Sequence, residues 1–142
     1  MLLRYPNVIA WVNGHTHVNH VIGHKRPSSW KVRGGFWEIS TASHIDFPQQ
    51  ARIVELVDNG DDTLSLFGTI IDSAAPLHWK STSNPNQLAA LSRELAANDW
   101  QERVSKLDAQ GHDGRRGAVS DRNVELLVHT PFSLACRGSL EP

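Results

Sequence analysis

The sequence has little cysteine, little net charge and no long apolar run. Cys136 is its single cysteine among 142 residues, so no disulfide can form within the chain. The formal net charge is −1, which argues against a protein that binds nucleic acid. No stretch approaches the roughly 20 consecutive apolar residues that a membrane-spanning helix needs. We therefore expect a chain whose partners are neither nucleic acid nor membrane.

What is present is the composition of a globular protein. Apolar residues make up 39% of the chain and charged residues 20%, which excludes wholesale disorder and fibrous repeats. The length suits one domain or one part of a larger domain. A compact chain of this size buries about 68–70% of its unfolded surface, which is enough for a hydrophobic core.

Local patterns predict several strands and one hairpin. Residues 8–12 are almost all apolar and end at Asn-Gly, which favours a buried strand followed by a turn. Residues 36–39 are also strand-like. Residues 51–58 and 63–72 alternate in part between apolar and polar, and the Asn59-Gly60 pair between them is typical of a hairpin turn.

A helix and two irregular segments complete the predicted α/β organisation. Asn84 followed by Pro85 is typical of a helix start, and spaced leucines extend the helical pattern to about residue 108. Residues 15–24 hold four histidines and are predicted to form a loop. The Gly-rich stretch 110–121 is predicted to be a linker. We accordingly divide the chain into 1–109, the linker, and a final part, 122–142, with one strand and a loose tail.

The motif with the clearest chemistry is Asn13-Gly14-His15-Thr16-His17. In extended backbone, His15 and His17 project to the same side, because side chains alternate with period two. Their imidazoles then converge on one metal ion or reach two neighbouring ions. Neutral imidazole is a common ligand of Zn, Fe and Mn ions. A bare His-x-His pair is often merely exposed, but its place after a buried strand and Asn-Gly favours metal binding.

Three stretches resemble one family, the calcineurin-like metallophosphoesterases. Residues 5–17 (YPNVIAWVNGHTH) resemble the last signature block of that family, a hydrophobic strand that ends in Gly-His-x-His. Residues 35–50 (GFWEISTASHIDFPQQ) resemble the strand that follows this block in one bacterial subfamily. Residues 121–128 (DRNVELLV) resemble the C-terminal end of that subfamily. The resemblance covers most of this chain but only the C-terminal part of the family's domain.

The resemblance implies a fold and a reaction. The fold is a two-sheet sandwich with helices outside, of which this chain is the C-terminal part with a flanking helix. His15 and His17 would each bind one ion of a dinuclear centre of the Fe, Mn or Zn type. The implied substrate is a small-molecule phosphate ester, either a monoester or a diester, and the metals would activate water and clamp the attacking and leaving oxygens.

The departure from the family pattern concerns the other metal ligands. The family's Asp-x-His, Gly-Asp-x-x-Asp and Gly-Asn-His-Asp/Glu blocks all precede Gly-His-x-His, and only fourteen residues precede His15. We therefore expect a C-terminal fragment that is inactive alone and whose partner is a missing N-terminal fragment. The alternative is an inactive remnant, or a small binding module with an incidental mononuclear His site. Full-length relatives often carry an export signal, so the localisation stays open.

Other histidines have two interpretations each. His20 and His24 either complete a four-histidine zinc site with His15 and His17 or lie in a polar loop at the mouth of the site, and we favour the loop. His44 either faces the metal pocket and touches substrate oxygens or is a hydrogen-bonded structural histidine. We assign no other candidate catalytic residue.

Overall fold

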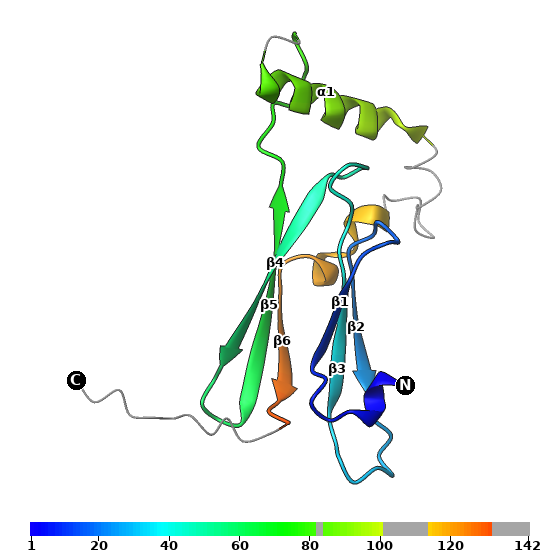
Figure 1. Ribbon diagram of the computed structural model, residues 1–142, viewed down its shortest axis with the longest axis vertical. Coiled ribbons are helices and arrows are strands. Elements are labelled where there is room, and N and C mark those ends of the chain that lie inside the picture. The colour runs from blue at the N-terminus through cyan, green and yellow to red at the C-terminus, as the bar shows by residue number, and fades with distance from the viewer. Residues whose placement is uncertain (82–83, 101–113, 132–142) are drawn as a thin grey trace, which may run out of the picture.

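The structure, a computed structural model, describes residues 1–81, 84–100 and 114–131. These residues form two three-stranded sheets, and an α-helix lies across one end of them (Figure 1). The mixed α/β class with two small sheets and a flanking helix is therefore confirmed. No helix in these ranges is long and apolar enough to cross a membrane.

The first sheet has the order β1-β3-β2, from β1 (Ala10–Asn13), β3 (Gly35–Ser40) and β2 (His20–Lys25). β1 runs parallel to β3, whereas β2 runs antiparallel to it. The prediction of a buried strand at residues 8–12 is wrong in one respect. The strand starts at Ala10 and lies at the sheet edge, where Trp11 is 47% and Val12 53% exposed. Apolar sequence does not ensure burial where a strand pairs on one side only.

The loop predicted at residues 15–24 is wrong at its C-terminal end, because β2 begins at His20. Its histidines, glycine and lysine are not typical strand formers, but an edge strand tolerates them because one of its sides and one of its faces are solvated. Gly23 pairs with Trp37 of β3. A Cβ atom at Gly23 would lie 3.0 Å from the indole ring of Trp37. The absence of a side chain at Gly23 therefore lets the indole pack against β2.

The second sheet has the order β4-β5-β6, from β4 (Gln50–Asp58), β5 (Thr63–Asp72) and β6 (Val124–His129), and all its strands are antiparallel. The predicted hairpin is confirmed, since β4 and β5 pair along their whole length. Its turn contains Gly60 at φ +75°, a conformation that glycine adopts without a steric cost. The strand expected near residue 124 is also present, as β6.

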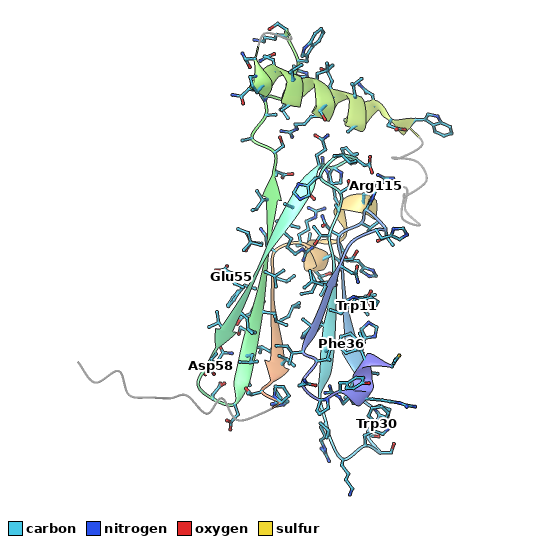
Figure 2. The ribbon with its side chains drawn as sticks, in the orientation of Figure 1. Trp11, Trp30, Phe36, Glu55, Asp58 and Arg115 are labelled. Atoms are coloured by element: carbon cyan, nitrogen blue, oxygen red, sulfur yellow. The ribbon has the colours of Figure 1, made fainter. Side chains whose placement is uncertain are left out.

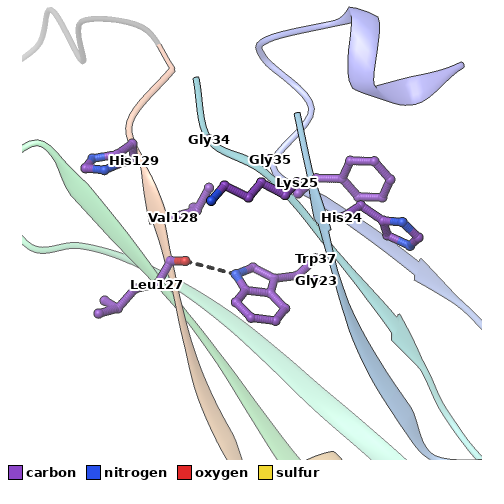
Figure 3. A pocket seen from close by; sticks show the side chains of 10 residues that line it. Gly23, His24, Lys25, Gly34, Gly35, Trp37, Leu127, Val128 and His129 are labelled. Atoms are coloured by element: carbon purple, nitrogen blue, oxygen red, sulfur yellow. Dashed lines mark hydrogen bonds between the residues drawn. The ribbon is translucent and has the colours of Figure 1, made fainter. Parts of the chain in front are cut away.

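A small core joins the two sheets. Ile39 of β3 packs with Leu66 of β5 and Leu126 of β6. Beside this cluster, Nε1 of Trp37 donates a hydrogen bond of 2.9 Å to the carbonyl oxygen of Leu127 (Figure 3). A cavity of about 310 Å³ opens next to that bond, between β2, β3 and the end of β6. The layers are thus joined by apolar contact and by the Trp37–Leu127 hydrogen bond.

The helix α1 (Pro85–Asn98) begins as predicted. The side chain of Asn84 accepts a hydrogen bond of 3.0 Å from the backbone N–H of Gln87, and Pro85 occupies the first turn. The predicted end near residue 108 lies outside the described residues. Only Ala90 is buried among the residues of α1, so this helix is weakly packed against the rest of the molecule.

The segment predicted as a linker is partly packed. Residues 110–113 lie outside the described ranges, but 3-10 turns follow in η2 (Gly114–Arg116) and η3 (Val119–Asp121). Arg115 is buried near the end of the sheets below α1 (Figure 2). Its guanidinium donates a hydrogen bond of 3.2 Å to the carbonyl oxygen of Phe47. A glycine-rich composition indicates a linker only where no side chain finds partners, and Arg115 finds them.

A buried arginine holds the first turn of the chain. η1 (Leu2–Arg4) is the first element of the chain, and Arg26 directly follows β2. The Arg26 guanidinium donates to the carbonyl oxygens of Leu3 at 2.9 Å and Tyr5 at 3.0 Å. Because five N–H donors project from one plane, a single arginine can gather several carbonyl groups.

Candidate metal-binding site

The loop after β1 does not have the conformation expected from the sequence. His15 has φ +73° and His17 has φ +56°, and the N–H of Thr16 donates to the carbonyl oxygen of Gly14 at 2.9 Å. These are left-handed conformations in a tight turn, so the prediction of an extended backbone is wrong. The alternation argument therefore does not apply to this pair. The turn is held against β3, because Thr16 Oγ1 lies 3.3 Å from Ser40 Oγ.

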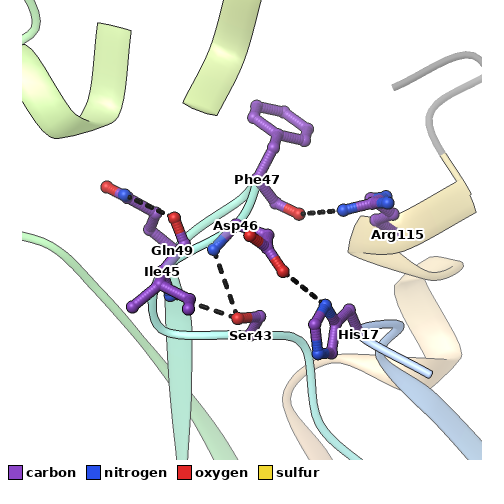
Figure 4. Close-up of polar contacts among 7 residues, drawn as sticks. All are labelled: His17, Ser43, Ile45, Asp46, Phe47, Gln49 and Arg115. Carbon is purple, nitrogen blue, oxygen red and sulfur yellow. Dashed lines mark hydrogen bonds and ion pairs between the residues drawn. The ribbon is translucent and has the colours of Figure 1, made fainter. Parts of the chain in front are cut away.

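A carboxylate meets His17 in this loop. The Nδ1 atom of His17 lies 2.5 Å from Oδ2 of Asp46, and the two side chains are 39% and 30% exposed (Figure 4). A proton on Nδ1 makes that atom the donor to Asp46 and leaves Nε2 with a lone pair. Both side chains are thus partly open to solvent.

Asp46 was not singled out from the sequence, although the topology contains a signal for it. β1 and β3 are parallel neighbours, so the loops that follow them leave the same edge of the sheet. His17 lies in the first of these loops and Asp46 in the second. A histidine and a carboxylate at these two places are therefore candidates for contact once the parallel pairing is known.

The loop that carries Asp46 is tightly organised. Ser43 Oγ accepts hydrogen bonds from the backbone N–H groups of Ile45 at 3.1 Å and Asp46 at 3.2 Å. The N–H of Gln49 donates to the carbonyl oxygen of Asp46 at 2.7 Å. The peptide bond between Phe47 and Pro48 is cis. The three hydrogen bonds fix the backbone on both sides of the carboxylate.

Buried Asn19 ties the two loops together. It lies two residues after His17 and is 1% exposed. Its Oδ1 accepts from the N–H of Ala42 at 3.0 Å, and its Nδ2 donates to Oε1 of Gln50 at 2.7 Å. Ala42 and Gln50 stand on either side of the Asp46 loop. Because a buried amide must satisfy its polar atoms, Asn19 sets the spacing between the loops.

The described residues do not form a complete metal site. His15 is exposed at the turn, and the ranges that the structure covers contain no group of three or more His, Cys, Asp or Glu side chains arranged to hold a metal ion. The donors present still suit a transition metal, since neutral imidazole binds Zn, Fe and Mn ions and His17 has one nitrogen anchored and the other left as a ligand. The fit is that of a partial site.

His20 and His24 lie on β2 and not in the predicted loop. Nε2 of His24 is 2.7 Å from Oε2 of Glu38 on β3, and its ring stacks on Phe36 at 4.7 Å between centroids. The hydrogen bond from His24 lowers the pKa of Glu38 below its usual value, and a second bond from Asn13 acts in the same direction. His24 is therefore engaged in a pair on the face of the sheet.

His44 lies in a separate hollow. It is exposed and lines a cavity of about 340 Å³ together with Ile71 of β5 and with Ala89 and Ser92 of α1. The structure thus places His44 against the helix, whereas His17 faces Asp46. A role of His44 in touching substrate stays a prediction.

Comparisons with known proteins identify no relative of this chain. No protein-family model, no curated protein and no solved structure matches it. The resemblance to the calcineurin-like metallophosphoesterases therefore rests on the quoted sequence blocks, and the site rests on the geometry of the loops after β1 and β3.

Proposed function

We propose that this chain carries the final histidine ligands, His15 and His17, of a metal-dependent phosphoesterase. The observation that carries the proposal is the state of His17. It lies in a fixed loop at the edge of the β1–β3 pair, Asp46 engages its Nδ1, and its Nε2 remains available as a ligand. The Gly-His-x-His motif at residues 14–17 resembles the motif in which the calcineurin-like metallophosphoesterases carry such a pair of ligands.

Two ions in such a site lower the pKa of water and neutralise the charge of a phosphate ester. The contribution of this chain is to bind and orient. Neutral imidazoles add no negative charge, which keeps the ions electrophilic. The turn at residues 14–17 brings the imidazoles to the edge of the sheet, where a substrate can approach from solvent.

The architecture supports the same proposal. Two sheets face one another across Ile39, Leu66 and Leu126, with a helix at one end. We propose that these layers are part of the metallophosphoesterase sandwich. Ligands beyond His15 and His17 then come from residues outside the described part of this chain or from a separate N-terminal fragment, and this chain alone is expected to be inactive towards phosphate esters.

Metal binding by single-histidine variants tests the ligand assignment. The full chain is dialysed against Zn²⁺ or Mn²⁺, and bound metal is measured for wild type, His15→Ala, His17→Ala and the control His129→Ala, which alters an exposed histidine on β6. We expect binding to weaken in both site variants and to persist in the control. Equal binding in all four proteins contradicts the proposal.

An activity assay separates the two functions considered for the chain. Hydrolysis of bis-p-nitrophenyl phosphate is measured for the metal-loaded chain with and without an N-terminal fragment that carries the family's missing ligand blocks. The phosphoesterase proposal expects turnover only in the mixture. A metal-binding module with an incidental mononuclear site expects one ion per chain and no turnover in either sample.

A further inference from the structure

We propose that Asp46 is the positioning residue of the metal site. It holds His17 as the tautomer with the proton on Nδ1 and so directs Nε2 towards the metal. This inference rests on the function proposed above and adds a residue that is not part of the Gly-His-x-His motif. Metal-bound histidines in proteins commonly donate their second ring N–H to a carboxylate, which fixes the ring and raises its basicity as a ligand.

The geometry of the contact supports this role. The distance of 2.5 Å between Nδ1 and Oδ2 places the two atoms in direct hydrogen-bonding contact. The bond is made through Nδ1, so it occupies the nitrogen nearer the backbone and leaves the outer nitrogen, Nε2, outside this contact. In the reverse arrangement Asp46 would bind Nε2 and block the atom best placed to reach a metal ion beyond the loop.

The support behind Asp46 also fits a positioning residue. A carboxylate can orient an imidazole only if its own backbone is fixed. Ser43 binds the N–H of Asp46, and the carbonyl oxygen of Asp46 accepts from Gln49. Arg115 of η2 donates to the carbonyl oxygen of Phe47, the residue after Asp46, and places positive charge near the Asp46 carboxylate. The loop thus presents an anchored acceptor to His17.

The tautomer of His17 tests the inference before any metal is added. Ring nitrogens are observed by long-range ¹H–¹⁵N NMR on the full chain with labelled histidine at about pH 8, and His17 is assigned with His17→Gln. We expect the proton of wild-type His17 on Nδ1, and a mixture of tautomers in Asp46→Ala. A wild-type His17 protonated on Nε2, or on both nitrogens at this pH, overturns the inference.

Metal affinity provides the second readout. Zn²⁺ or Co²⁺ is titrated into wild type, Asp46→Asn, His17→Ala and the control Asp62→Asn, whose residue lies in the β4–β5 turn at φ +64°, a conformation that asparagine also accepts. We expect the dissociation constant to rise about 10- to 100-fold in Asp46→Asn and to stay unchanged in the control. The metal should perturb Nε2 of His17, and a metal that perturbs Nδ1 contradicts the inference.

The two proposals fail in different ways. Loss of affinity in His17→Ala without loss in Asp46→Asn leaves the ligand proposal standing and overturns the role of Asp46. Unchanged affinity in His17→Ala overturns both. Circular dichroism and backbone amide spectra show whether each variant folds, and if the Asp46 variants do not fold, the wild-type tautomer and the nitrogen that the metal perturbs decide the question.

Discussion

At the scale of single residues, the His24–Glu38 pair makes stability depend on pH. The hydrogen bond from His24 lowers the folded-state pKa of Glu38 below the usual value of 4.5. A lowered carboxyl pKa stabilises the fold above the unfolded-state pKa, and this stabilisation is lost as the pH falls through the folded-state pKa. We expect the free energy of unfolding of the wild type to fall more steeply below about pH 4.5 than that of Glu38→Gln.

Urea denaturation followed by circular dichroism between about pH 6 and about pH 3 measures this difference. Glu55→Gln is the control, because Glu55 is an exposed carboxylate on β4 (Figure 2). Parallel pH profiles for wild type and Glu38→Gln would show that the pair does not contribute.

Arg26 is the residue whose loss should cost the most stability near the first turn. Arg26 is 6% exposed, and its guanidinium donates to carbonyl oxygens of the first turn, including those of Leu3 and Tyr5. Hydrogen bonds that involve a charged group contribute more than neutral ones. We expect Arg26→Ala to lower the free energy of unfolding by about 2–3 kcal/mol. In the matched control Lys25→Ala, a change within about 0.5 kcal/mol is expected, and equal effects of the two variants would refute the assignment.

At the scale of elements, the helix cap gives a local prediction. Asn84→Ala removes the bond to the N–H of Gln87 and should destabilise α1 by about 1 kcal/mol. Ala90 is the sole buried residue of α1. We therefore expect hydrogen exchange of the α1 amides to become faster and exchange in the sheets to change little. Asn86→Ala is the control, because Asn86 lies in the first turn of α1 but is not its N-cap. Faster exchange in the sheets as well as in α1 would contradict a weakly coupled helix.

The elements that the sequence predicts well are those with local signals. Asn59-Gly60 sets the β4–β5 turn, and Asn84-Pro85 starts α1, because each acts on the backbone of its own neighbours. β2 was missed because its strand character comes from pairing with β3, a contact that composition does not encode. The same holds for residues 114–121, where the burial of Arg115 depends on a carbonyl oxygen of Phe47.

The sequence proposes the residues of the candidate site, an assignment that stays a prediction, but it does not give their conformation. The motif at residues 14–17 marks His15 and His17 as candidate ligands, but both adopt positive φ, which follows from the tight turn at Gly14. The partner of His17 was not predictable, because Asp46 reaches it only through the parallel pairing of β1 and β3. Long-range contacts of this kind are set by topology and not by neighbours in the sequence.

At the scale of the whole molecule, exposed sheet edges predict association. β1 has a neighbour on one side only, within the described residues, and carries exposed Val12. Unpaired edges of this kind bind one another. We expect sedimentation to show concentration-dependent association of wild type that Val12→Lys reduces, because charge on an edge opposes pairing.

Val32→Lys is the matched control for the edge prediction. Val32 is an exposed valine as well, at 46% against 53% for Val12, but it lies in the loop between β2 and β3. The added charge is the same in both variants, so only the place differs. Equal reduction by both variants would indicate a general effect of charge and not pairing at β1.

Because Trp37 is bonded to β6, its fluorescence can report on the contact between the two sheets. Trp37 is the one tryptophan of five that is not exposed; the others are Trp11, Trp30, Trp79 and Trp100. Acrylamide should therefore quench the fluorescence of the four exposed tryptophans more readily than that of half-buried Trp37. The less readily quenched fraction should disappear if the two sheets separate, so fluorescence quenching reports on the contact between the sheets during heating, dilution or the addition of a partner.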